Sequence, residues 1–236
     1  MPASYPSHPS DTTSVLTNGS SCREEIECFQ INRDCHFDHL ETVNKDPDSP
    51  EMDIPISDIK PYYKPPSSQT SPNNIADSPT IQKTIQTLNL QIHPEGGYFV
   101  ETDRSQLRIP NPHRHANLNP TVETDDDATR AASTTIYYML TPSSPLGAFH
   151  RNASRTVHTL HRGRGRYVII HADQAARHGG KAPVESFVVG HRLEEGERLQ
   201  WIVEGGKFKS SYLLPDSDAG ETEGLLISEV RYTYDC

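Results

Sequence analysis

No stretch of this 236-residue chain is apolar for long enough to cross a bilayer. Residues 1–20 also lack a basic segment followed by an apolar one, which is the pattern of a secretory signal. We therefore expect a cytoplasmic protein that makes no contact with a membrane.

An excess of positive charge is absent as well. The 22 lysines and arginines are outnumbered by 32 aspartates and glutamates, which gives a formal net charge of −10. Nucleic acids attract proteins through a broad positive field, so no nucleic-acid partner is expected. The chain has no Ser-His-Asp order, nucleotide loop or glycine-rich dinucleotide turn, and therefore nothing in it indicates a hydrolase, a kinase or a dinucleotide-binding fold.

Cysteine is scarce, and the four cysteines lie near the two ends of the chain: Cys22, Cys28, Cys35 and Cys236. This distribution leaves the expected core without a disulfide, as in a reducing compartment. The first three lie close to His36 and His39, and all five side chains can bind zinc. Because the close cysteine pair of common zinc modules is missing, we interpret this segment as a cysteine-bearing tail.

The composition indicates one folded part and one solvated part. Only 33% of the residues are hydrophobic, and the mean hydropathy of −0.69 is too low for one uniform globule of this length. More than half of the 19 prolines precede Thr80, where no apolar periodicity is present. We interpret residues 1–77 as a disordered, Pro/Ser-rich extension and residues 78–236 as the folded domain.

The folded domain is expected to begin with a short helix. Ser78 and Pro79 fit the N-cap and first helical position, and apolar residues then recur at helical spacing: Ile81, Ile85 and Leu88. Pro94 ends this pattern, and Gly96 and Gly97 allow a sharp turn into a strand near Tyr98.

The rest of the domain has the pattern of an all-β fold. Short runs rich in β-branched and aromatic residues are separated by glycines and prolines: 134–140, 156–160, 167–171, 184–189, 199–203, 210–214 and 225–230. Such spacing favours a sandwich or barrel. Residues 106–129 carry three prolines and the triplet Asp125 to Asp127, and we interpret them as a long surface loop rather than a calcium site.

Several motifs occur in the order typical of one family: 93–98 (HPEGGY), 133–140 (STTIYYML), 149–151 (FHR) and 199–203 (LQWIV) leading to Gly205 and Gly206. On these residues the chain resembles the cupin superfamily, in its RmlC-like branch of domains of unknown function, over about residues 88–229. The resemblance implies a jelly-roll barrel with a pocket inside, often assembled as a homodimer.

What such a pocket does is less specific than the fold. Cupins include metal-dependent oxygenases, sugar epimerases, isomerases and plain binding proteins, and a fold alone does not decide among them. The resemblance implies no particular reaction. Because ionisable residues converge on a barrel that can enclose one small polar ligand, one hypothesis is an isomerase, epimerase or tailoring enzyme of small-molecule (secondary) metabolism. The alternative is a non-catalytic ligand-binding or scaffold cupin without metal.

Two departures from the family pattern bear on these expectations. Thr156 stands where relatives carry a glutamate, and Thr159 stands where they carry a histidine, so the usual metal-ligand set is incomplete. We therefore assign no metal ligand and leave the cofactor open, a divalent metal included. The chain also stops soon after Val230, so either a last strand is absent or the C-terminus comes from an altered gene model.

The candidate catalytic residues are His150 and Glu95, in acid or base roles. Burial would suit Glu95 to be a base, but it could equally cap a turn or pair with Arg151 or Arg104. The candidate ligand-binding residues are Tyr98, Tyr138, Arg151, His158 and His161. Regular alternation along the strand puts His158 and His161 on opposite faces.

The segment 162–166 (RGRGR) contributes to the one dense group of basic side chains in an acidic chain. Guanidinium groups and glycine amides could together hold a phosphate or carboxylate beside the barrel mouth. The simpler interpretation, which we favour, is a glycine hairpin turn with solvated arginines.

Overall fold

The computed structural model describes residues 52–63, 76–112 and 128–233. The cysteines, the triplet Asp125 to Asp127 and the greater part of the N-terminal extension lie outside these residues. Within them the chain forms one α-helix and twelve strands: α1 Pro79–Thr87, β1 Gln91–Ile92, β2 Tyr98–Arg104, β3 Arg108–Pro110, β4 Thr129–Ala131, β5 Ser133–Leu140, β6 Leu146–Arg151, β7 Thr156–Arg162, β8 Arg164–Ile170, β9 Val184–Val189, β10 Gln200–Val203, β11 Phe208–Leu214 and β12 Leu225–Tyr232. Three short 3-10 helices accompany them: η1 Ile56–Asp58, η4 Ala172–His178 and η5 Leu193–Glu195.

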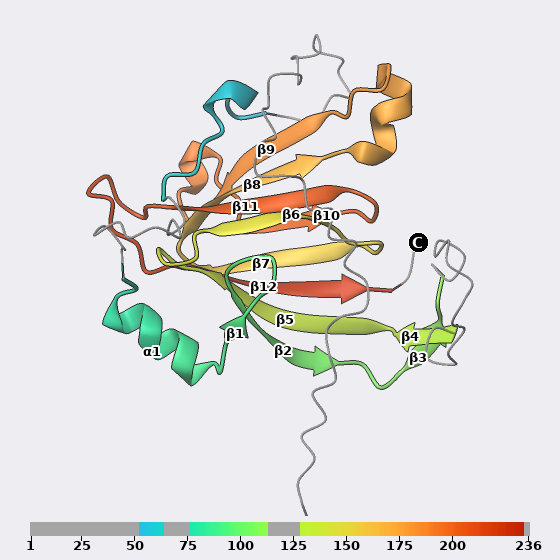
Figure 1. The fold of residues 1–236 in the computed structure, drawn as a ribbon, viewed down its shortest axis with the longest axis horizontal. Helices are drawn as coiled ribbons and strands as arrows, with labels where there is room; N and C mark the ends of the chain where they lie inside the picture. Colours follow the sequence, from blue (N-terminus) through green and yellow to red (C-terminus); the bar gives the residue numbers. More distant parts are fainter. Residues whose placement is uncertain (1–51, 64–75, 113–127, 234–236) are drawn as a thin grey trace, which may run out of the picture.

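Two antiparallel sheets form the barrel, as Figure 1 shows. The large sheet has the order β1-β2-β5-β12-β7-β10, and the small sheet has the order β6-β11-β8-β9. Inward-facing side chains of both sheets share one hydrophobic core, in which Tyr138 and Ile227 of the large sheet pack with Tyr167 and Leu213 of the small one. The all-β barrel expected from the sequence is confirmed.

The predicted N-terminal helix is confirmed as α1. The Ser78 side chain accepts a hydrogen bond from the Ile81 backbone N–H at 3.3 Å, which caps the helix. Ile81 is fully buried and packs with Leu90 and Met139 on the outer face of the large sheet. The helix therefore covers part of the surface that faces away from the barrel interior (Figure 1).

Residues 52–63 correct the expectation that order begins only at residue 78. We call them the strap, because they lie across the outer face of the small sheet. Ile56 and Ile59 are buried there against Val168 and Val184, and the Tyr63 hydroxyl donates to the Gly220 carbonyl at 2.8 Å. The sequence concealed this segment because prolines interrupt its apolar residues and prevent a regular period.

The expected surface loop 106–129 is also partly structured. Arg108–Pro110 and Thr129–Ala131 pair as β3 and β4, and Ile109 is buried. Proline is tolerated at the end of such a short strand, where its missing N–H disrupts no ladder.

The seven strands predicted from apolar runs and the strand expected near Tyr98 are all present. The structure adds β1, β3, β4 and β6, and β6 carries the FHR motif. The last described strand, β12, lies between β5 and β7 and pairs with both. The edges of β5 and β7 that face each other are thus both paired.

No helix among the described residues combines the length and the apolar character needed to span a membrane.

Candidate functional site

The HPEGGY turn places Glu95 at one end of the barrel interior. The His93 N–H donates to the Gly97 carbonyl at 3.0 Å, and the Gly96 N–H donates back to the His93 carbonyl at 3.0 Å. Gly96 has φ +98°, and a Cβ there would lie 2.1 Å from the Leu146 carbonyl oxygen, so a glycine is required. The close approach lets the turn lie directly against β6.

A bulge in β6 sets the direction of His150. Lys209 of β11 pairs with His150 and Ser211 pairs with Gly147, so two residues of β6 stand opposite Ser210 alone. The Ser210 hydroxyl donates to the Gly147 carbonyl at 2.7 Å across this irregularity. Such bulges redirect side chains, and this one accompanies the inward position of His150.

Glu95 and His150 form a close pair. His150 Nδ1 lies 2.9 Å from Glu95 Oε2 and 3.0 Å from the Ala148 carbonyl oxygen. Since both neighbours are acceptors, Nδ1 carries the proton. The Glu95 side chain is only 3% exposed, and its Oε1 has no hydrogen-bond partner among the described residues. Glu95 therefore pairs with His150 and not with either arginine considered above.

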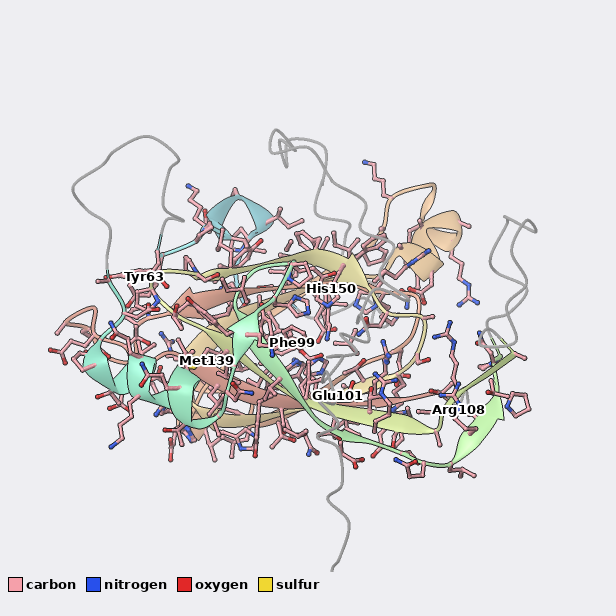
Figure 2. The ribbon with its side chains drawn as sticks, turned by 60° about the horizontal axis from the view of Figure 1, so that its bottom comes forward. Tyr63, Phe99, Glu101, Arg108, Met139 and His150 are labelled. Atoms are coloured by element: carbon pink, nitrogen blue, oxygen red, sulfur yellow. The ribbon has the colours of Figure 1, made fainter. Side chains whose placement is uncertain are left out.

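His93 completes this end of the site. Its Nδ1 accepts from the Glu95 backbone N–H at 3.2 Å, and its ring packs edge-on against Phe99 at 4.7 Å. Burial lowers the pKa of His93, although the Glu95 carboxylate opposes that effect. In Figure 2, His150 and Phe99 lie toward the middle of the molecule, whereas Tyr63 and Arg108 lie toward opposite ends.

A second polar group bridges the barrel interior. Lys209 of the small sheet donates through Nζ to His158 Nε2 at 2.8 Å and to Glu229 Oε2 at 2.6 Å. His158 and Glu229 are direct partners on β7 and β12 of the large sheet. The His158 ring is fully buried and stacks on Trp201 with 5.1 Å between ring centroids.

The protonation states of this second group follow from its burial. Desolvation, with a contribution from the Lys209 ammonium, lowers the pKa of His158 to about 4, so its imidazole is neutral near pH 7. Burial alone would raise the pKa of Glu229, but Lys209 and His158 outweigh that effect and hold the pKa well below its usual range. The group is thus an ammonium between a carboxylate and a neutral imidazole.

Tyr138 connects the turn to the interior. Its hydroxyl donates to the Gly96 carbonyl at 2.9 Å, and its ring lies 5.8 Å from that of His93. Burial raises its pKa, so the phenol keeps its proton. The side chain fills the space beside Gly147, where a Cβ would lie 2.7 Å from the Tyr138 oxygen.

The register of β6 and β11 brings the two polar groups together. His150 and Lys209 are direct cross-strand partners, and the side chains of such partners are neighbours on one face of a sheet. We call the combined set the interior site: His93, Glu95, His150, His158, Lys209 and Glu229.

Comparison with known proteins agrees with this architecture. Residues 82–232 match the family model of the cupin superfamily described as DUF985. The chain belongs to the cupin superfamily.

Relatives of this cupin span most of the chain. It is 41% identical over 179 residues to the uncharacterized protein YML079W of Saccharomyces cerevisiae. The aligned residues cover 75% of this chain and 76% of that protein. Among solved structures, a hypothetical protein from Leishmania major is 30% identical with a TM-score of 0.49, over 65% of this chain and 82% of that one. Protein SO0799 from Shewanella oneidensis is 18% identical with a TM-score of 0.46, over 67% and 78% of the two chains.

The cupin barrel brings only some of the predicted site residues together. His150, Glu95, Tyr138 and His158 face the interior. Tyr98 instead packs on the outer face with the cluster under α1, and His161 is exposed, with its ring 5.5 Å from that of Tyr137. Arg151 lies over the Phe208 ring at 5.6 Å, on the opposite side of β6 from His150.

Lys209 and Glu229 were missed from the sequence, although a signal exists. In Phe208–Leu214 the lysine alternates with Ser211 and Leu213, and in Leu225–Tyr232 the glutamate alternates with Leu225 and Ile227. A charged residue at an inward position of an otherwise apolar face indicates a buried polar group.

The arginines of the RGRGR segment have acidic partners in the cupin barrel. Arg162 lies 3.9 Å from Glu223, Arg164 lies 2.5 Å from Glu197, and Arg166 lies 2.6 Å from Asp53 of the strap: these contacts are ion pairs. Gly163, with φ +82°, makes the tight turn between β7 and β8. The hairpin interpretation is wrong, because β7 and β8 lie in different sheets and do not pair, so the turn carries the chain from one sheet to the other. The arginines pair with acids rather than with solvent alone.

A divalent metal does not fit the described side chains. No three His, Cys, Asp or Glu residues in the described ranges converge as a metal site. Thr156 is buried on the interior face of β7 but supplies only a hydroxyl, which bonds with the Asn152 amide. His158 and Glu229 are an imidazole and a carboxylate that come close to each other in the barrel. The Lys209 ammonium contacts both of them.

Proposed function

We propose that this cupin encloses a small polar metabolite and moves a proton on it, as an isomerase or epimerase does. The observation that carries the proposal is the buried Glu95 carboxylate, held at Oε2 by His150 with Oε1 left without a partner among the described residues. A buried carboxylate oxygen without a donor is costly, and a ligand hydroxyl or C–H proton would satisfy it.

The chemistry assigns a role to each member of the pair. Glu95 Oε1 removes a proton from the carbon next to a carbonyl group, and the C–H electron pair moves toward the carbonyl oxygen. His150 Nδ1–H keeps the other carboxylate oxygen in place. Return of a proton from Glu95 to the neighbouring carbon, with transfer of the hydroxyl proton to the former carbonyl oxygen, gives an isomer. If the planar intermediate first turns its other face to Glu95, return of the proton to the original carbon gives an epimer.

Solvent exchange tests this proposal without knowledge of the natural substrate. The protein is incubated in D₂O with pentoses, hexoses and 2-hydroxy acids, and deuterium at carbon is followed by ¹H NMR. We expect incorporation into at least one compound and a loss of about 100-fold or more in Glu95→Gln and His150→Gln. His161→Gln, on the outer face, is the matched control and keeps the full rate.

Two outcomes separate the alternatives. A compound that raises the melting temperature of the wild-type protein without exchange at any carbon would support a non-catalytic binding cupin and overturn the acid–base role. Equal exchange by the wild-type protein and Glu95→Gln would assign the proton transfer to another group.

The remaining expectations from the sequence stay predictions. A homodimer is tested by light scattering of the full chain, and a place in secondary metabolism is tested by the class of compound that exchanges.

A further inference from the structure

Lys209 holds a position that is unusual for a lysine. Its side chain is 3% exposed, and its ammonium lies between the imidazole of His158 and the carboxylate of Glu229. An imidazole nitrogen and a carboxylate oxygen are the donors that borderline divalent metals select. We infer that Lys209 is the resident cation of this barrel, occupying the place that a divalent metal would need.

The charges around Lys209 support this role. Glu229 is anionic and His158 is neutral, so Nε2 of His158 accepts a hydrogen bond as it would bind a metal. The contacts with His158 and Glu229 use two of the three N–H groups of the Lys209 ammonium. No other residue in the described ranges accepts a hydrogen bond from Nζ. One N–H of a buried cation thus remains for a ligand oxygen.

The neighbouring Glu95–His150 pair narrows the ligand class. Because His150 is the cross-strand partner of Lys209, a ligand beside both groups meets a cationic donor and an unpartnered carboxylate oxygen. Lys209 suits a carbonyl or carboxylate oxygen, and Glu95 Oε1 suits a hydroxyl or an acidic C–H. The ligand is a hydroxycarbonyl compound or a 2-hydroxy acid, a conclusion that rests on the function proposed above.

Lys209 would then stabilise the intermediate. As Glu95 takes the proton, negative charge grows on the carbonyl oxygen, and a preorganised ammonium lowers the energy of that charge. The proton taken by Glu95 exchanges with solvent before Glu95 returns a proton to carbon, so atoms and electrons balance without any further reactant.

Cobalt titration tests the cation position without any ligand. Co²⁺ is added to chelator-treated wild-type protein and to Lys209→Ala, and binding is followed by visible absorption and calorimetry. We expect no stoichiometric site in the wild-type protein. In Lys209→Ala we expect one site, made by His158, Glu229 and water, that is lost in Lys209→Ala/His158→Ala. No gain of binding in Lys209→Ala would overturn the inference. Stoichiometric binding by the wild-type protein that His158→Ala abolishes would overturn the inference.

A second measurement avoids any risk that Lys209→Ala fails to fold. In ¹⁵N-histidine-labelled wild-type protein, His158 is expected to show a protonated Nδ1 and an accepting Nε2 near pH 7, with no change when Zn²⁺ is added. A shift of Nε2 to a metal-bound value would contradict the resident-cation role.

Whether Lys209 binds a ligand oxygen is tested with the double variant Lys209→Met/Glu229→Gln. This variant removes both charges and so leaves the Glu229 position without an unpaired buried carboxylate. Loss of exchange by about 100-fold or more, with a cooperative melting transition retained, supports oxygen binding by Lys209. Full exchange by this variant would overturn that role while the function of Glu95 stands. Absence of exchange in the wild-type protein would refute the proposed function, and the cobalt titration would still decide the cation position.

Discussion

The Lys209 ammonium and the Glu229 carboxylate meet at 2.6 Å inside the barrel, one from each sheet. The contact joins β11 to β12 through side chains in addition to the shared apolar core. An ion pair in such a place brings little net stability, but removal of one partner leaves a buried charge unpaired.

Lys209→Met should therefore destabilise the fold by about 3–5 kcal/mol, because it leaves the Glu229 carboxylate without its cation. Urea unfolding measures the change. Arg104→Met, which removes the partner of Glu101 in an exposed pair, is the matched control and should change stability by no more than about 1 kcal/mol. Equal effects of the two substitutions would show that the interior pair is solvated.

Stability should fall as the pH is lowered from about 6.5 to 4. His158 has a pKa of about 4 in the fold against 6.5 for a solvent-exposed imidazole, so the unfolded chain binds the proton first as the pH falls. This difference in pKa lowers the free energy of unfolding by about 3 kcal/mol at acid pH. Below pH 4.5 the low pKa of Glu229 adds a further loss, because the unfolded chain then also protonates this carboxylate more readily.

Thermal melts across this pH range check the assignment. His158→Gln should melt at a lower temperature near neutral pH but with a flatter dependence between pH 6.5 and 4. His161→Gln, at an exposed position on the same strand, should keep the slope of the wild-type protein. An unchanged slope in His158→Gln would assign the acid sensitivity to other groups.

The sequence predicted α1 because Ser78 and the apolar spacing after it are local signals, and it predicted most strands because their composition is local too. It also selected His150 and Glu95, which the structure brings to 2.9 Å. The contact between His150 and Glu95 could not be predicted from the sequence, because it depends on the bulge opposite Ser210 and on the close approach of Gly96 to β6.

The strap and Lys209 were not predicted, for related reasons. Ile56 and Ile59 are buried only because the small sheet offers an apolar outer face, which is a property of the assembled barrel. The alternation of Lys209 with Ser211 and Leu213 is a weak signal, and its partners Glu229 and His158 come from the other sheet. Tertiary contacts of this kind leave only a weak trace in one sequence.

The strap should be needed for full stability of the barrel. A chain that begins at residue 52 should melt like the full chain, whereas one that begins at residue 78 should melt at a clearly lower temperature. Ile59→Ala should cost about 2–4 kcal/mol, because its side chain is buried. The exposed neighbour Lys60 provides the control, and Lys60→Ala should change stability by about 0.5 kcal/mol at most. Equal melting of the two truncated chains would refute this role.

Gly96→Ala should damage both the fold and the site. The new Cβ would lie 2.1 Å from the Leu146 carbonyl, so the turn that carries Glu95 must move away from β6. Gly196→Ala is a matched control, since Gly196 has φ +82° but nothing within 4 Å of the added carbon, and it should cost only about 1–2 kcal/mol. Urea unfolding of both variants compares the two costs, and equal values would show that the turn tolerates the displacement.

Deuterium incorporation by chelator-treated protein measures the proton transfer at Glu95 and its independence from metal in one assay. We predict that the wild-type protein places solvent deuterium on a hydroxycarbonyl compound or 2-hydroxy acid without added metal, and that Glu95→Gln does not. Exchange that requires an added divalent metal would show that a metal takes part in the reaction. Equal exchange in both proteins would show that Glu95 is not the base.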